Sequence, residues 1–389
     1  MNRLDTTGLT AAPGQVWGGI RLVPLIRETP VEGLRLRHEL YGDDGEGGSG
    51  PGYGMVDTGD RTRYVSYIPH GFVADWSGSG EGGQAAAYGT RLGGEPPPCV
   101  PLRVHHRLAK RRRDKGTAER RLRFLPLHLA LDGYLSLHFG GPSVVWDEWS
   151  REAVRQGLTP RAEAAYAGWA IPGLGDALRV FEIHPGQCGV LVYAADSLAA
   201  AFAVPHPEDY RALHRSLLED LYGELVYQYA FFGRPVAGFE TRLGDGVRLR
   251  SLADLRAAAV EAGREWTRGH DTLMASRLLD ASYRFERVYA MEAFTLWRFL
   301  PSFRRGEPEQ HIGETITDRK GRVAYLKSFR LSDAQIRRGY LLDRLHDHDW
   351  HLDRTAGALG TSRADLVRRI RDAGFGSLVK QGAERAGGG

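Results

Sequence analysis

Five residues near the end of the chain have the types and spacing of a DNA-contacting helix: Ser362, Arg363, Arg368, Arg369 and Arg371. Arginines on one helix can reach phosphate oxygens and can pair bidentately with the edge of guanine. A serine directly before such a helix is a favourable N-cap. These residues are therefore the candidate DNA contacts, and double-stranded DNA is the expected partner.

Three helices are expected to position these residues between Ser332 and Gly376. Ser332 is the expected N-cap of the first helix, which carries Ile336, Tyr340, Leu341 and Leu345 on one face and is closed by Trp350 and Leu352.

The second helix is expected from about Asp353 to Leu359, ending at Gly360, which can supply the positive φ of a tight turn. Ser362 should cap the third helix and Gly374 should end it. Ala356 precedes Gly360 by four residues, where two crossing helices leave room only for a small side chain, and Leu359, Leu366 and Ile370 should be buried between them. This pattern predicts a helix-turn-helix.

The segment AGALGTSRADLVRRIRDAGF resembles the Fis-type helix-turn-helix, which is also the C-terminal domain of bacterial enhancer-binding activators. The shared elements are Ala356, Leu359-Gly360, Ser362-Arg363, Leu366, Arg368, Arg369, Ile370 and Gly374. The resemblance covers about forty-five residues and implies a homodimer held through the first helix, with the third helix in the major groove. Asp365 departs from the small polar residue usual in the family, and Val367 from a common basic residue. A carboxylate at Asp365 should repel phosphate.

Catalytic and metal-binding patterns are weaker. His346, His348 and His351 straddle a helix end beside aspartates, which suits solvent better than a metal ion. Glu182 with His184, and Asp220 with Glu224, could do acid–base work but lack further partners. Cys188 has no identifiable second histidine or acid, and SGSGEGG lacks the Lys-Ser/Thr of a P-loop. We expect no cofactor or metal, and the sequence leaves enzymatic activity open while favouring a non-catalytic protein.

Composition indicates a soluble protein. The chain has 389 residues, a formal charge of +4 and two cysteines, Cys99 and Cys188. This charge is too small to imply nucleic-acid binding by itself, and so few cysteines suit a reducing cytoplasm. The N-terminus has no apolar core of the signal-peptide kind, and no apolar run is long enough to span a membrane. We therefore expect a cytoplasmic protein with no membrane partner.

An α+β fold is expected before these helices. Alternating patterns between Val16 and Ile68 predict antiparallel strands around a Gly-rich loop at 42–54. The basic run at 103–123 is either a phosphate-binding arm or, as we favour, a solvated surface. Residues 177–204 predict a hairpin turning at Pro185-Gly186 plus a third strand. A helix from Pro207 to Phe231, with Leu213, Leu217, Leu221 and Leu225 as an apolar stripe, should lie across them.

The organisation predicted from these patterns has four parts: an α+β sensor or partner domain at 13–235, a helical segment at 250–303, a linker at 304–328 with at most a short hairpin near Arg319 to Gly321, and the helix-turn-helix at 329–380.

Residues 175–230 resemble the ARG and rhodanese-phosphatase-superfamily-associated domain, through the hairpin, a third strand ending before a helix, and the tyrosine-rich helix end from Tyr222 to Tyr229. That domain occurs in bacterial conflict-type gene neighbourhoods. We therefore expect a bacterial transcriptional regulator. The alternatives are an accessory component of a conflict or nucleotide-signalling system, whose helix-turn-helix contacts protein, and a hydrolase with its site in the first 235 residues.

Overall fold

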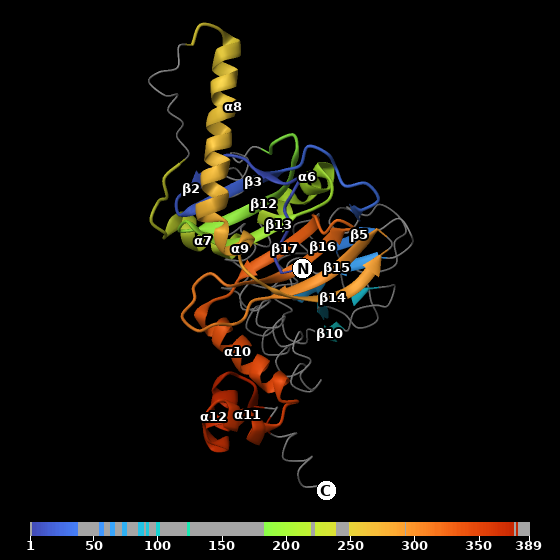
Figure 1. Cartoon of the computed structure of the whole chain (residues 1–389), viewed down its shortest axis with the longest axis vertical. Helices are drawn as coiled ribbons and strands as arrows, with labels where there is room; N and C mark the ends of the chain where they lie inside the picture. The colour runs from blue at the N-terminus through green and yellow to red at the C-terminus, as the bar shows by residue number, and fades with distance from the viewer. Residues whose placement is uncertain are drawn as a thin grey trace, which may run out of the picture.

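The computed structural model describes residues 2–37, 183–218, 222–238, 249–291, 293–376 and 379, together with short strands between 54 and 124. A large antiparallel sheet lies at the centre of the molecule (Figure 1). Its strands are β1 (Thr10–Ala11), β2 (Gln15–Trp17), β3 (Ile20–Ile26), β12 (Gln187–Ala194), β13 (Ser197–Ala203), β14 (Arg284–Met291), β15 (Phe294–Leu300), β16 (His311–Asp318) and β17 (Val323–Arg330). They follow the order β1-β3-β12-β13-β17-β16-β15-β14, and β2 also pairs with β3.

Two smaller antiparallel sheets come from the first part of the chain. One contains β4 (Arg35–Arg37), β5 (Gly54–Asp57), β6 (Arg63–Ser66) and β9 (Arg91–Leu92). The other contains β7 (Phe72–Asp75), β8 (Ala85–Tyr88), β10 (Cys99–Pro101) and β11 (Arg123–Phe124). These strands agree with the antiparallel β-structure expected from the alternating sequence.

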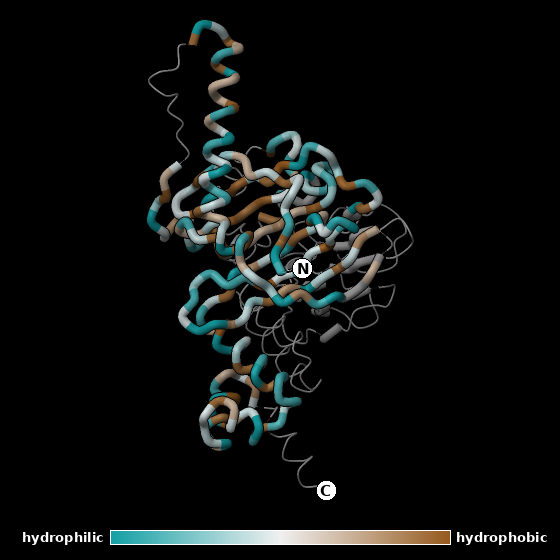
Figure 2. The backbone as a smooth tube through the Cα atoms, viewed as in Figure 1, coloured by the Kyte–Doolittle hydropathy of each residue, from teal (hydrophilic) through white to brown (hydrophobic). Residues whose placement is uncertain are grey.

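The central strands of the large sheet are buried on both faces. Every residue of β12 is buried, and β16 and β17 are buried except at their last residues. One apolar core includes Val190, Phe202 and Tyr325, and the other includes Leu191, Tyr193 and Phe299. Figure 2 shows apolar residues recurring along the central strands, as expected for strands covered on both sides.

Helices cover or extend from this sheet. They are α6 (Pro207–Ser216), α7 (Gly223–Phe231), α8 (Leu252–Gly269), the π-helix η4 (His270–Met274), α9 (Ser276–Leu279), α10 (Asp333–Asp347), α11 (Leu352–Ala358) and α12 (Arg363–Asp372). α6 packs on β12 and α7 on β3. α8 projects from one end of the molecule, while α10 to α12 lie at the opposite end (Figure 1).

α10 is held against the loop between β15 and β16. The buried ring of Phe303 lies directly beside Gly339, at a place where a Cβ atom would be 2.3 Å from Cε1 of that ring. Arg284 of β14 donates to the Asp343 carboxylate at 3.0 Å, and the Arg305 guanidinium stacks 4.6 Å from the ring centre of Tyr340. These contacts join the C-terminal helices to the sheet.

The structure corrects the predicted hairpin and long helix. Pro185-Gly186 do form a turn, closed by a hydrogen bond from the Gln187 N–H to the His184 carbonyl. β12 begins directly after this turn and pairs with β13, the predicted third strand, through a turn at Ala195 and Asp196. The other edge of β12 pairs with β3, where the predicted hairpin required residues before Pro185. Residues 177–182 lie outside the described residues. The expected continuous helix is divided into α6 and α7, and α7 begins at Gly223.

The apolar stripe of that helix is tested only in part. Leu217 is buried and Leu225 is half-buried against the core. The side chains of Leu213 and Leu221 lie outside the described part, as does nearly all of the basic run at 103–123.

The predicted helical segment at 250–303 is wrong after Leu279. β14 and β15 form a hairpin in which Phe285 lies opposite Phe299. The aromatic side chains of residues 283–299 have a spacing that also fits a helix. In the structure they pack across neighbouring strands, and the ring centres of Phe285 and Phe299 are 5.8 Å apart.

The predicted linker at 304–328 is wrong as well. β16 and β17 form a hairpin inside the large sheet, so no domain boundary separates these residues from β13, which pairs with β17. The turn near Arg319 to Gly321 is confirmed, with Gly321 at a φ of 84°. Polar residues such as Thr315, Lys327 and Ser328 hide these buried strands from a hydropathy pattern.

Candidate functional site

α11 and α12 are joined by a tight turn that lies between Ala356 and Ser362, as the sequence predicted. Gly360 has a φ of 59°, and the Thr361 N–H donates to the Ala356 carbonyl at 3.0 Å. Ser362 then caps α12, since its hydroxyl accepts from the Asp365 N–H at 3.1 Å. Ser332 likewise caps α10 in a reciprocal capping box with Gln335. α10 ends at Asp347, earlier than expected, because Asp349 and Trp350 have positive φ.

The two helices pack through the expected small and apolar residues. Ala356 is almost fully buried, and Leu366 and Ile370 are completely buried in the same core. Phe375, beyond the end of α12, is also buried. Because Leu366 and Ile370 occupy the inner side of α12, the opposite side of this helix faces solvent.

The four candidate arginines are all exposed. The side chain of Arg363 is 52% exposed and that of Arg368 is 71% exposed. Arg369 and Arg371 are exposed as well. Arg363 forms an ion pair with Asp353 at 3.1 Å, and Arg368 pairs with Asp365 at 2.7 Å. Such surface pairs contribute only about 0–1 kcal/mol, so a phosphate or base could replace either one.

Ser362 is used within the protein. Besides capping α12, its hydroxyl donates to the Asp365 carboxylate at 2.8 Å. The structure therefore places Ser362 beside the candidate arginines as a residue that fixes Asp365.

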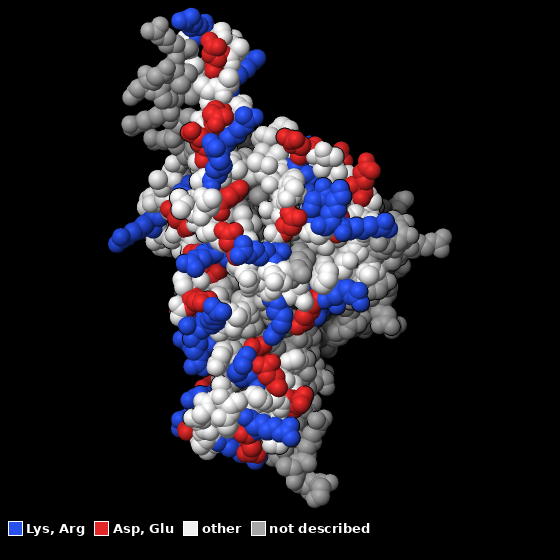
Figure 3. Space-filling view, viewed as in Figure 1, with Lys and Arg blue, Asp and Glu red and all other residues white. Residues whose placement is uncertain are grey.

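Acidic residues are interleaved with this basic set. Between 352 and 372 the chain has five arginines and three aspartates. Figure 3 shows both signs of charge over the C-terminal helices on the face drawn. The surface is therefore weakly positive, with carboxylates that limit where an anion can bind.

The three C-terminal histidines do not form a metal centre. His351 caps α11, with its Nδ1 accepting from the Arg354 N–H at 3.3 Å, and His346 lies in the last turn of α10. In the part of the chain that the structure describes, no group of three or more histidine, cysteine or acidic side chains has the arrangement of a metal site.

The apolar face of α10 is buried within the chain. Ile336, Leu341 and Leu345 all belong to the same core as the sheet. Tyr340 is partly buried and lies between Arg305 and Arg344. The face that the Fis resemblance implies for dimerisation is thus occupied by intramolecular contacts.

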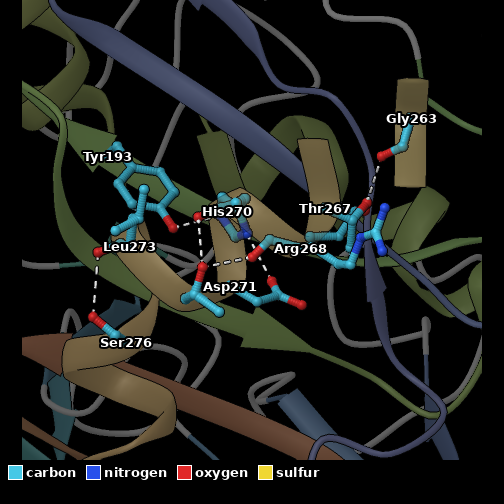
Figure 4. Close-up of polar contacts among 11 residues, drawn as sticks. Tyr193, Gly263, Thr267, Arg268, His270, Asp271, Leu273 and Ser276 are labelled. Carbon is cyan, nitrogen blue, oxygen red and sulfur yellow. Dashed lines mark hydrogen bonds and ion pairs between the residues drawn. The ribbon is translucent and has the colours of Figure 1, made fainter. Parts of the chain in front are cut away.

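A second polar cluster was missed by the sequence analysis. The Tyr193 hydroxyl lies 2.6 Å from Nε2 of His270, and Nδ1 of His270 lies 2.8 Å from the Asp271 carboxylate. Figure 4 shows these side chains pointing toward one another. The Trp266 ring stacks on His270 at 4.9 Å. The geometry fits a chain in which Tyr193 donates to His270, which donates to Asp271. Sequence offers little signal for it, since Tyr193 and His270 are 77 positions apart.

This cluster connects α8 to the sheet. His270 begins the π-helix η4, a form often found at functional sites. Both ring side chains are buried, and burial raises the pKa of Tyr193 above its ordinary value, which keeps the phenol protonated. A substrate cannot reach His270 in this arrangement, so the hydrogen bonds among Tyr193, His270 and Asp271 serve to hold η4 and the base of α8 in position.

An open pocket of about 520 Å³ lies beyond η4, between α9 and the 301–310 loop. Its titratable lining residues are Arg277, Asp280, Tyr283, Arg304, Glu307 and Glu309. It lies outside the first 235 residues, where the alternative interpretation as a hydrolase would place its site.

The sequence model of the family described as ARPP-2 matches residues 4–292. The chain belongs to the ARPP-2 family. No match was found among curated proteins or among solved structures. The ARPP-2 match runs from before β1 to the end of β14, so α10 to α12 lie beyond it.

Of the catalytic candidates within the ARPP-2 region, the structure describes the side chains of His184 and Cys188. Cys188 is fully buried, and its thiol lies 3.6 Å from the Leu25 carbonyl. Burial raises the pKa of this thiol, which disfavours the reactive thiolate. His184 accepts from the Gly186 N–H through Nδ1. Glu182, Asp220, the side chain of Glu224 and the SGSGEGG segment lie outside the described residues.

None of the helices described here combines the length and the apolar character that crossing a bilayer requires.

Proposed function

We propose that α10 to α12 form a Fis-type helix-turn-helix that binds double-stranded DNA. The observation that carries the proposal is the arrangement of α12: its apolar side is buried against α11 across the Gly360 turn, and its free side presents exposed arginines. An exposed helix with this support can enter the major groove, which has room for an α-helix.

On this proposal the protein is a bacterial, cytoplasmic transcriptional regulator. The ARPP-2 region would bind a ligand or partner. The contact of Asp343 with Arg284, which lies within that region, would link it to the DNA-binding helices. A homodimer through α10 would need a face of that helix other than the one containing Ile336 and Leu341.

Replacing Arg363 and Arg368 together by alanine should weaken DNA binding by several kcal/mol at most. Each base-reading pair is worth about 1–3 kcal/mol, and each lost phosphate contact should lower the salt slope by about one unit. Asp365→Thr should tighten binding to non-specific duplexes, because it removes a carboxylate from beside the phosphates. Fluorescence anisotropy with labelled duplexes at two salt concentrations measures all of these effects.

The matched control is the double variant Arg264→Ala/Arg268→Ala in α8. These side chains are 72% and 70% exposed and pair with Glu261 at the opposite end of the molecule. The control should bind DNA as the wild type does. Equal losses in both double variants would show that binding follows net charge alone and would overturn the role of α12.

One observation favours the first alternative, an accessory component whose C-terminal helices contact another protein. Asp353 and Asp365 pair with the two candidate arginines, and mixed charge of this kind also suits a protein interface. If the protein binds no duplex DNA, whatever its sequence, the interpretation as an accessory component takes precedence over the regulator.

A further inference from the structure

The exposed side of α12 presents an acid and a base next to each other. With Leu366 and Ile370 on the buried side, the 100° step of an α-helix places Asp365 and Arg368 outward. Their side chains are 41% and 71% exposed. They are the third and sixth of the ten residues of α12, about one turn apart, and Asp365 lies in the N-terminal part of the helix, whose residues contact base edges in a recognition helix.

The pair is fixed in orientation. Nη2 of Arg368 donates to Oδ1 of Asp365 at 2.7 Å, and the Ser362 hydroxyl donates to Oδ2 of Asp365 at 2.8 Å. The Asp365 N–H donates to the same Ser362 hydroxyl at 3.1 Å. Both carboxylate oxygens are therefore held, and the guanidinium lies against one of them with its remaining N–H groups directed elsewhere.

Such a pair presents donors beside an acceptor. In the major groove a G·C pair shows two adjacent acceptors, guanine N7 and O6, followed by the donor N4 of cytosine. An arginine meets the two acceptors, and a carboxylate beside it meets the donor. An A·T pair shows acceptor, donor and acceptor, which does not match this order.

We infer that Arg368 and Asp365 together read one G·C base pair, with Ser362 as a positioning residue. The inference rests on the proposed DNA binding and names its substrate class: duplex DNA whose binding site contains a G·C pair under residues 365–368 of α12. The carboxylate of Asp365 repels phosphate, which lowers the affinity for non-specific DNA. The same carboxylate lets the protein distinguish a G·C pair from an A·T pair.

The test is selection from a pool of randomised duplexes with the full-length protein, followed by affinity measurements on the selected site and on the same site with one G·C pair changed to A·T. Wild type should prefer G·C at one position by roughly 5- to 150-fold, the range that one base-reading pair provides. Asp365→Ala and Arg368→Ala should each remove most of this preference. Asp365→Asn should shrink it, because the amide adds a donor where only an acceptor fits.

Asp372→Ala is the matched control, because it removes one exposed carboxylate from the last turn of the same helix. It should leave the G·C preference unchanged. Helical circular dichroism confirms that each variant is folded.

Three results separate the two proposals. Salt-dependent binding without enrichment of any base overturns the G·C inference and leaves DNA binding standing. Enrichment that survives both Asp365→Ala and Arg368→Ala also overturns the inference, since other residues then read the base. Absence of duplex binding overturns both proposals.

Discussion

Gly339→Ala should destabilise the protein although alanine favours helices. In an exposed helix interior, glycine to alanine gains about 1 kcal/mol. At Gly339 the new Cβ would lie 2.3 Å from Cε1 and 2.4 Å from Cδ1 of Phe303, whose ring is fully buried. Because the ring has no space to move into, we take the upper part of the 1–3 kcal/mol range for overpacking, which leaves a net loss of about 2 kcal/mol.

Gly357→Ala in α11 is the matched control, because its Cβ would meet nothing within 4 Å. It should stabilise the protein by about 0.5–1 kcal/mol. Urea unfolding of the full chain, followed by circular dichroism, measures the free energy of unfolding for both variants. Phe303→Leu combined with Gly339→Ala should recover part of the loss, because a smaller side chain makes room. If Gly339→Ala stabilises as Gly357→Ala does, then α10 is not packed on Phe303 and the C-terminal helices are not docked as described.

Two further predictions concern buried charge. Lys327 and Glu314 form a fully buried ion pair at 2.9 Å. Lys327→Met alone should therefore lower the free energy of unfolding, measured in urea, by about 3–5 kcal/mol, and adding Glu314→Gln should recover much of this loss. An unchanged free energy of unfolding in Lys327→Met would contradict a structural role for the ion pair. Burial lowers the pKa of His311 to about 3, so between pH 6.5 and pH 3 the unfolded chain binds a proton that the folded protein does not. The free energy of unfolding therefore decreases as the pH is lowered through that window. Between pH 7 and pH 5 this decrease should be about 2 kcal/mol smaller in His311→Gln than in the wild type. An unchanged pH dependence in that variant would show that His311 does not titrate this way.

Local patterns predicted those parts of the molecule whose contacts are close in sequence. Ser332, Gly360 and Ser362 specify caps and a turn through interactions that span only a few residues, and the structure shows each of them in its expected conformation. The antiparallel strands near the N-terminus also followed from alternation.

Long-range pairing explains the failures. β16 and β17 are buried strands, but Glu314 and Lys327 within them are charged, and their burial depends on each other and on β13, more than one hundred residues earlier. Phe285 and Phe299 have a spacing that fits either a helix or a hairpin, and only pairing with β16 decides between them.

The candidate site shows the same division. Spacing identified the exposed arginines, whereas the ion pairs of Arg363 and Arg368 and the use of Ser362 by Asp365 depend on rotamers that no spacing specifies. The Tyr193–His270–Asp271 cluster depends on where α8 meets the sheet, which is a tertiary contact.

The most direct test of the account is the salt dependence of duplex binding by the wild-type protein. If about four exposed arginines neutralise phosphates, the logarithm of the affinity should fall with a slope of about −3.6 against the logarithm of salt concentration, which is roughly a hundredfold loss between 50 and 200 mM. Anisotropy titrations of a labelled duplex at several salt concentrations measure this slope. A slope near that value, reduced in Arg363→Ala/Arg368→Ala and unchanged in Arg264→Ala/Arg268→Ala, is the result expected if α12 docks on DNA. No binding at low salt, or binding that does not respond to salt, would contradict it.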